Sequence, residues 1–283
     1  MIGGSEDNLA LGWLVFSGVS VAFALVASAM TVCWGPGANG SGVVELIAYL
    51  NGINYPDFIG FETFVTKVFG VVFAVTGGLC VGKEGPLAHV GGCIGAAVAY
   101  LWIPNFAWFR NDTMKRKLIA AGASAGVSAA FGAPVGGTLF AFEISKPNIF
   151  WKFSVIWKVF MTCALSVFML AVVQGLMAGQ PIDLINSSVL KFGVENIKPS
   201  TFEVLPGSFI TGAICGVMGA TFVLVNSNLG LIRKKYVNTT WKKLLETCIF
   251  SLGTTSCFYF FPVLFPDCEP VSATSSATTE ILV

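Results

Sequence analysis

The sequence is poor in charge. Only 11% of its 283 residues are Asp, Glu, Lys or Arg, whereas 55% are hydrophobic. A soluble domain needs a larger share of charged residues to cover its surface, so this composition predicts an integral, multi-pass membrane protein in a lipid bilayer. The formal net charge of +1 provides no basic field for nucleic acid, and no nucleic-acid partner is expected.

The residues that carry most enzyme chemistry are also scarce. The chain has a single histidine, His89, and its eight cysteines occur singly, without a Cys-x-x-Cys pair. Metal sites and redox motifs need such residues in clusters. No nucleophile triad and no phosphate-binding loop is recognisable either. We therefore expect no catalytic residues, no metal and no cofactor, and we do not expect an enzyme.

What the sequence has instead is a series of long apolar runs, which predicts an all-α membrane protein. A helix needs roughly 20 apolar residues to cross a bilayer. Several runs reach that length, but 118–145 is broken near Pro134 into two pieces that we expect to be too short to cross alone. Interrupted helices are typical of transporters and channels, where their ends line an ion site. The predicted segments are 9–34, 43–50, 62–80, 84–102, 118–145, 150–178, 203–232 and 241–262.

Two basic clusters predict the orientation in the membrane. Lys and Arg gather at 110–117 and again at 233–243. Cytoplasmic loops carry an excess of these residues, so we place both clusters in the cytoplasm. The segment 179–202 then faces outward. Plasma membrane and endomembrane both remain open as locations.

Three Gly-rich stretches occur at the expected helix breaks, at 35–42, 82–86 and 131–137. The first two each precede an apolar helix. A helix N-terminus offers unpaired backbone N–H groups and the positive end of the helix dipole, and both favour an anion. We therefore predict an anion site between these two helix starts, with Ser41 as the hydroxyl donor and Glu84 as a tethered anion.

Five residues around these helix starts are our candidates for anion binding. Glycines permit a close approach of the backbone to an ion, and a hydroxyl holds the ion without a full positive charge. For the lysine, attraction of anions and simple snorkelling towards water are equally good interpretations. The candidates are Ser41, Gly42, Gly82, Lys83 and Gly85.

The three stretches, in this order, resemble the CLC family of chloride channels and chloride/proton exchangers. The family motif GSGIP appears as GSGVV at 40–44, GKEGP is intact at 82–86, and the third region is matched by GVSAAFGAPVGGTLFAFE at 126–143. The resemblance implies a bundle of tilted and broken helices with inverted-repeat architecture, incomplete in this chain. It also implies chloride as the transported ion and a homodimer.

By this resemblance, Ser41 contacts the central chloride, and Glu84 is a gating glutamate that occupies an anion site and swings away when it is protonated. A serine at position 41 favours chloride over nitrate. Simpler interpretations exist for both residues. Glu84 would then only complement the helix dipole, and Ser41 would cap the following helix. His89 is expected to be a hydrogen-bonded packing residue rather than a proton relay.

Two positions depart from the family pattern. In the family's exchangers a second glutamate, a proton relay, directly follows the glutamate of the LFxxE stretch, but here Ile144 follows Glu143. An aliphatic side chain cannot carry a proton, so this position favours a passive channel, gated by voltage or pH. A chloride/proton antiporter stays the alternative. Val44 replaces the proline of the first motif and weakens the fixed helix start.

The resemblance also predicts the domain organisation. Residues 1–178 correspond to a first membrane repeat without its leading helix, 179–202 to the outward-facing linker, and 203–262 to the first helices of a second repeat. We expect 263–283 to be a disordered tail. The family's GxFxP motif and late pore tyrosine do not appear before Val283. A truncated, non-conducting membrane subunit is therefore a further alternative.

Overall fold

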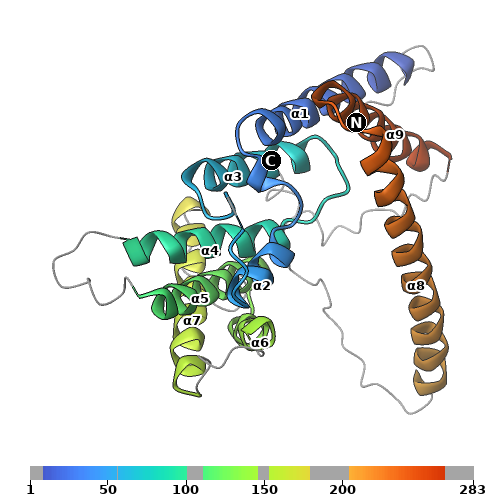
Figure 1. Ribbon diagram of the computed structural model, residues 1–283. Coiled ribbons are helices and arrows are strands. Elements are labelled where there is room, and N and C mark those ends of the chain that lie inside the picture. The colour runs from blue at the N-terminus through green and yellow to red at the C-terminus, as the bar shows by residue number, and fades with distance from the viewer. Residues whose placement is uncertain (1–8, 56, 101–110, 146–152, 179–203, 265–283) are drawn as a thin grey trace.

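The computed structural model describes residues 9–55, 57–100, 111–145, 153–178 and 204–264, and within these ranges every regular element is a helix (Figure 1). The predicted linker 179–202 lies outside the described residues, and so does the predicted tail from residue 265. The elements are α1 (Leu9–Cys33), the short 3-10 helix η2 (Pro36–Ala38), α2 (Val43–Leu50), α3 (Phe61–Thr76), α4 (Glu84–Tyr100), α5 (Asp112–Phe131), α6 (Pro134–Ser145), α7 (Phe153–Ala178), α8 (Val204–Tyr236) and α9 (Thr240–Leu264).

The helices confirm the segments predicted from the apolar runs, and four of those described are long and apolar enough to cross a membrane. Each of the four contains a strongly apolar 18-residue window with at most two charged residues. The spans are Leu9–Cys33, Ser154–Met177, Val204–Tyr236 and Thr240–Pro262. The elements that carry the Gly-rich motifs are not among them. The helices next to these motifs are therefore too short or too polar to cross a membrane alone, and they depend on packing against neighbouring helices for their stability.

The predicted break in 118–145 is confirmed, but the expected length of its first piece is wrong. Gly132 ends α5 in the left-handed conformation, with φ +65°, and Pro134 begins α6. Helix α6 has 12 residues, about 18 Å, and is too short to span. Helix α5 has 20 residues and begins within the basic cluster, where the Asn111 side chain accepts a hydrogen bond from the backbone N–H of Thr113. This N-cap stabilises the polar first turn.

Helices α4 and α5 cross in close backbone contact at the centre of the bundle (Figure 1). Gly91 and Gly95 of α4 face Gly122 and Gly126 of α5, and a Cβ at any of these four positions would collide with a backbone carbonyl of the other helix. Each helix thus presents two small residues spaced four apart, the pattern that lets membrane helices approach closely.

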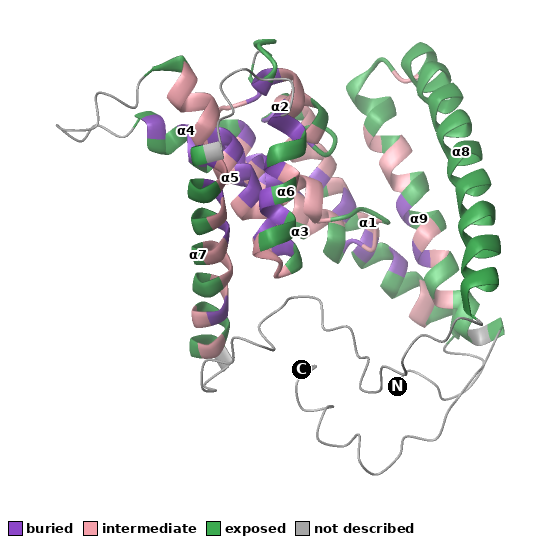
Figure 2. Cartoon of the chain, turned by 90° about the horizontal axis from the view of Figure 1, so that it is seen from below, coloured by how far each residue is buried: buried purple, intermediate pink, exposed green. Residues whose placement is uncertain are grey.

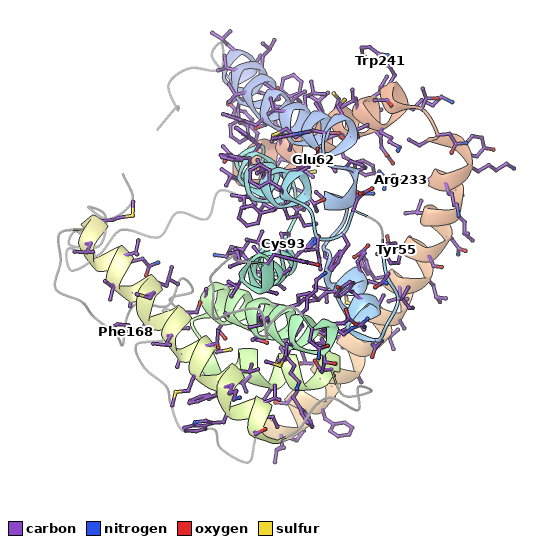
Figure 3. All side chains as sticks on the ribbon, turned by 60° about the vertical axis from the view of Figure 1, so that its left-hand side comes forward. Tyr55, Glu62, Cys93, Phe168, Arg233 and Trp241 are labelled. Atoms are coloured by element: carbon purple, nitrogen blue, oxygen red, sulfur yellow. The ribbon has the colours of Figure 1, made fainter. Side chains whose placement is uncertain are left out.

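The remaining helices pack around this pair. Helix α7 covers α5 and α6, helix α1 packs on α3 and α9, and the short α2 lies on α4 and α6. The main buried cluster lies between α2, α4, α5 and α6. Cys93 of α4 is also buried, whereas the side chains of Trp241 and Phe168 lie on the outside (Figure 3). Helix α8 has no buried residue (Figure 2). Its exposed apolar side chains suit a lipid environment.

Replacing Gly122 by alanine is expected to destabilise the fold. The added methyl group meets the carbonyl of Gly91, and overpacking of this kind costs about 1–3 kcal/mol. The measurement is the thermal unfolding midpoint of the purified protein in detergent. Gly216→Ala in α8 is the matched control, because a Cβ there meets nothing within 4 Å. Equal midpoints for the two variants would contradict the close contact between α4 and α5.

Candidate functional site

The loop before α2 and the start of α4 lie against each other. A Cβ built on Gly85 would be only 2.8 Å from the Cβ of Ser41. Helix α4 begins at Glu84 and α2 begins at Val43, so two helix N-termini meet here. The sequence predicted that these two Gly-rich stretches come together, and the structure confirms it. The third stretch, at 131–137, makes the turn between α5 and α6.

Ser41 stands in a loop whose shape depends on its two neighbours. Gly40 and Gly42 both have left-handed backbone conformations, with φ +71° and +82°. The exposed Ser41 hydroxyl accepts a hydrogen bond from the backbone N–H of Val43, at 3.3 Å. A hydroxyl that accepts in this way still has its own O–H to donate. Ser41 can therefore support the start of α2 and bind an anion at the same time.

Glu84 is half-buried, and its carboxylate folds back over Gly82. A Cβ on Gly82 would lie 2.5 Å from the Oε2 atom of Glu84, so a larger residue there would displace the carboxylate. Among the described residues, neither Glu84 nor the half-buried Lys83 forms an ion pair. The Glu84 carboxylate therefore lies unpaired at the helix N-terminus, where the dipole favours an anion.

His89 connects α4 to the loops on either side of it. The side chain is 1% exposed, its ring stacks on Phe58 with centroids 4.4 Å apart, and Nε2 is 2.8 Å from the Phe58 carbonyl oxygen. A carbonyl only accepts, so Nε2 carries the proton and Nδ1 keeps a lone pair. The ring also fills the space beside Gly42, where a Cβ would collide with it. The expected packing role is confirmed.

Lys67 is a site residue that the sequence analysis missed. It lies on α3, is 3% exposed, and donates hydrogen bonds to the carbonyl oxygens of Ala38 at 2.8 Å and Gly40 at 2.7 Å. These carbonyls belong to the loop that carries Ser41. The sequence feature that could have identified Lys67 is its position as the one lysine inside the apolar run 62–80. Burying an ionisable side chain in a membrane segment costs free energy, so such a residue usually has a function.

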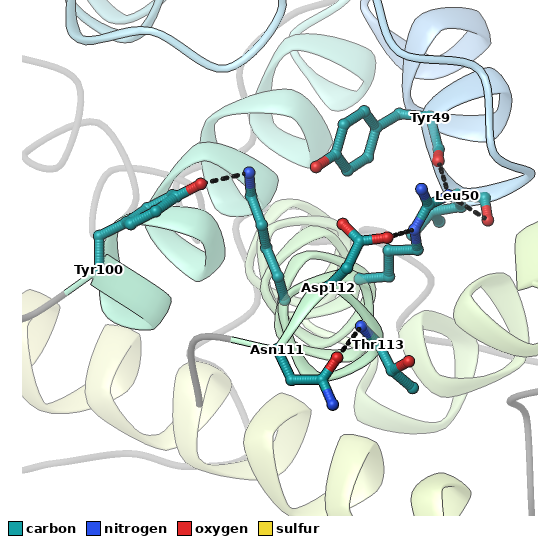
Figure 4. A network of polar contacts seen from close by, with 8 residues as sticks. Tyr49, Leu50, Tyr100, Asn111, Asp112 and Thr113 are labelled. Atoms are coloured by element: carbon teal, nitrogen blue, oxygen red, sulfur yellow. Dashed lines mark hydrogen bonds and ion pairs between the residues drawn. The ribbon is translucent and has the colours of Figure 1, made fainter. Parts of the chain in front are cut away.

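The basic cluster at the start of α5 holds the other end of α2 (Figure 4). Arg116 Nη1 donates to the carbonyls of Tyr49 at 2.7 Å and Leu50 at 3.4 Å, while Nε pairs with Asp112 at 3.0 Å. A cation at the C-terminus of a helix satisfies its last carbonyls and its negative dipole end. From the sequence this cluster indicated only the orientation in the membrane, and its contact with α2 was not predicted.

Lys115 joins the same cluster through two aromatic rings. Its ammonium group donates to the Tyr100 hydroxyl at 2.7 Å and lies over the Tyr100 ring, 4.8 Å from its centroid. It is also 5.7 Å from the centroid of the Tyr49 ring. Cation–π contacts at exposed sites contribute about 0.5–1 kcal/mol. Together with Arg116, Lys115 links the C-terminal ends of α2 and α4 to α5.

The Ile144 side chain is buried in apolar surroundings. It is 6% exposed and belongs to the buried cluster that includes Leu46, Tyr49 and Leu50 of α2. Its neighbour Glu143 is exposed. Consecutive residues of a helix point about 100° apart, so the exposed carboxylate does not replace the buried side chain.

Comparison with known proteins places these features in a family. Residues 23–282 match the family described as voltage gated chloride channel. The chain is 33% identical over 279 residues to the Homo sapiens "H(+)/Cl(-) exchange transporter 7", covering 95% of this chain and 34% of that protein. It is 32% identical over 285 residues to the Dictyostelium discoideum "Chloride channel protein A", covering 98% of this chain and 32% of that protein. The chain thus spans about a third of the length of these relatives.

Two solved structures share the fold. A slow cyanobacterial Cl-/H+ antiporter aligns with a TM-score of 0.68 at 23% identity, covering 96% of this chain and 60% of that one. A eukaryotic CLC transporter aligns with the same score and identity, covering 89% of this chain and 42% of that one. The all-helical membrane fold expected from the sequence motifs is confirmed.

Replacing His89 by leucine is expected to lower the thermal unfolding midpoint in detergent. The change leaves the Phe58 carbonyl unpaired in the interior, which costs about 1–3 kcal/mol. His89→Gln is the matched variant, because its amide N–H can still donate, and it should lose less stability. If the two variants are equally stable, the hydrogen bond to Phe58 is not what holds the ring in place.

Proposed function

The chain belongs to the voltage-gated chloride channel family, which its match over residues 23–282 shows, and we propose that it forms a gated pathway for chloride across a membrane. One observation carries the proposal, namely the contact between Ser41 and the start of α4. It brings a hydroxyl, two helix N-termini and the carboxylate of Glu84 to one place. This combination can hold an anion without binding it too tightly to release.

In this proposal the chloride ion is held by the Ser41 hydroxyl and by backbone N–H groups around Gly42, Gly82 and Gly85. Lys83, half-buried beside Glu84, raises the local concentration of anions. The Glu84 carboxylate competes with chloride because both are anions at the same helix N-terminus. Protonation removes the charge of the carboxylate and opens the pathway. Glu84 is therefore the gate.

We propose passive conduction, because position 144 lies in an apolar cluster and carries no titratable group. The second candidate is chloride/proton exchange, which the names of the relatives favour, among them "H(+)/Cl(-) exchange transporter 7". An exchanger built on this chain would have to move protons by a route that does not use residue 144.

The assembly and the repeat organisation also belong to the proposal. We treat 1–178 as the first membrane repeat and 203–262 as the first helices of the second. A homodimer is the proposed assembly, with the outer faces of α6 and α7 at the interface. Leu139 is 62% exposed and Leu165 is 63% exposed, so these faces have apolar side chains for a second copy to cover.

Glu84→Gln is expected to give chloride efflux from liposomes that is high and independent of pH. The wild-type protein should instead conduct more as the pH falls, since protonation at low pH neutralises the Glu84 carboxylate. Glu62→Gln, an exposed acid at the start of α3, is the control and should keep the wild-type pH dependence. Folded wild-type protein without any chloride flux would overturn the proposal and support the non-conducting subunit instead.

Proton counting separates the two candidate functions. In liposomes with a chloride gradient, a passive channel collapses the gradient without moving protons uphill, because Ile144 offers no proton acceptor. We expect chloride flux with no coupled change of internal pH. Proton uptake driven by the chloride gradient, and abolished in Glu84→Gln, would establish exchange and contradict passive conduction.

A further inference from the structure

The turn between α8 and α9 concentrates positive charge at one end of two helices. Helix α8 ends at Tyr236 and α9 begins at Thr240, so the connection is short. Five basic residues and one acidic residue lie within 233–246, which we call the basic turn, whereas the net charge of the whole chain is only +1. The basic residues are Arg233, Lys234, Lys235, Lys242 and Lys243.

Four of the five positive charges in the basic turn lack an anionic partner. The single acid, Glu246, pairs with Arg233 at an Oε2–Nε distance of 2.8 Å. Lys242 donates a hydrogen bond to the carbonyl oxygen of Tyr236 at 3.2 Å, which satisfies a carbonyl at the end of α8 but does not neutralise the ammonium group. Within the described part of the chain, no carboxylate pairs with any of the four lysines, and all four are exposed. The protein thus gathers four ammonium groups and leaves them open to an external anion.

The two helices that enter the basic turn determine its place in the membrane. Both α8 and α9 are long and apolar enough to cross a bilayer, so the turn that joins them lies at a membrane surface. Tyr236 and Trp241 flank the turn with exposed side chains, and Figure 3 shows Trp241 projecting away from the bundle. Such rings collect at the level of the lipid headgroups. The lysines beside them therefore lie at headgroup depth as well.

The surroundings of the basic turn favour a phospholipid over a soluble anion. The excess of Lys and Arg predicts that this side faces the cytoplasm, where the membrane leaflet contains anionic lipids that attract basic clusters. Helix α8 has no buried residue, and Leu229 and Ile232 expose apolar side chains just before the turn. A lipid can therefore place its headgroup among the lysines while its acyl chains lie along α8. A soluble anion would gain only the first of these contacts.

We propose that the basic turn binds anionic phospholipids of the cytoplasmic leaflet, with its four lysines around the phosphate and carboxylate of a phosphatidylserine headgroup. The bound headgroup offsets the repulsion between the ammonium groups. It also fixes the depth of α8 and α9 in the bilayer. This inference does not depend on which ion the protein carries.

The test replaces two lysines that hold nothing else in place. Lys234 and Lys243 have no ion pair and no side-chain hydrogen bond with the described residues. The test variant is Lys234→Gln/Lys243→Gln. The matched control, Lys117→Gln/Lys158→Gln, removes two positive charges from the second turns of α5 and α7. A further variant, Lys234→Arg/Lys243→Arg, keeps the charge of the turn and separates charge recognition from damage to the fold.

Two quantities are measured on the purified protein in detergent. Native mass spectrometry gives the affinity for added phosphatidylserine and for added phosphatidylcholine, and hydrogen exchange of the backbone amides in 237–243 locates the bound lipid. We expect the wild-type protein to prefer phosphatidylserine, and we expect this lipid to slow exchange in 237–243. Lys234→Gln/Lys243→Gln should weaken phosphatidylserine binding about tenfold, because each lysine near an anionic surface contributes several-fold to the affinity.

The control and the arginine variant should both keep the preference and the slowed exchange. Equal binding of the two lipids to the wild-type protein would overturn the proposal, and so would unchanged phosphatidylserine binding in the glutamine variant. An equal loss in the arginine variant would show that charge is not what is recognised. Full protection of 237–243 by glycerophosphoserine, the soluble headgroup, would also contradict the proposal, since the turn would then bind anions without a membrane.

Discussion

The close backbone contact between α4 and α5 is the constraint on which the rest of the structure depends. Gly126 meets the carbonyl of Leu87, which lies in the first turn of α4 together with Glu84. Because backbone touches backbone there, the start of α4 has little freedom to shift relative to α5. The Glu84 carboxylate is therefore presented from a rigid element, although its helix is too short and Gly-rich to be stable alone.

Helix α2 illustrates how a membrane protein builds a site from pieces that cannot stand alone. With eight residues it has few internal hydrogen bonds, and no water in a bilayer core replaces the missing ones. Two side chains from neighbouring helices hold this element instead. Lys67 of α3 donates hydrogen bonds to carbonyl oxygens in the loop before the helix, and Arg116 of α5 donates one to a carbonyl oxygen at its end. The charged residues that the composition makes so scarce are thus placed where backbone oxygens need them.

Local sequence features were enough to predict the helices, the break near Pro134 and the burial of His89, whereas the contact between the two Gly-rich motifs was predicted from the affinity of two helix N-termini for one anion. The first three predictions depend on apolar runs, proline and glycine, whose effects act within a few residues. The roles of Lys67 and Arg116 escaped prediction because their partners lie 27 to 67 residues away in the chain. The length of α5 was underestimated because its first turns are polar and lie outside the apolar run, although Asn111 caps them.

The surroundings of Ile144 involve the same short helix. Ile144 packs in one cluster with Leu46 and Leu50, and Ser41 lies just before the start of that helix, so α2 links the loop of Ser41 to the cluster around position 144. A titratable group at 144 would have to be buried among these apolar side chains, where its charged form is strongly disfavoured. Isoleucine completes the cluster instead. We propose passive conduction as the simpler mode of transport, because this packing leaves no titratable group at position 144.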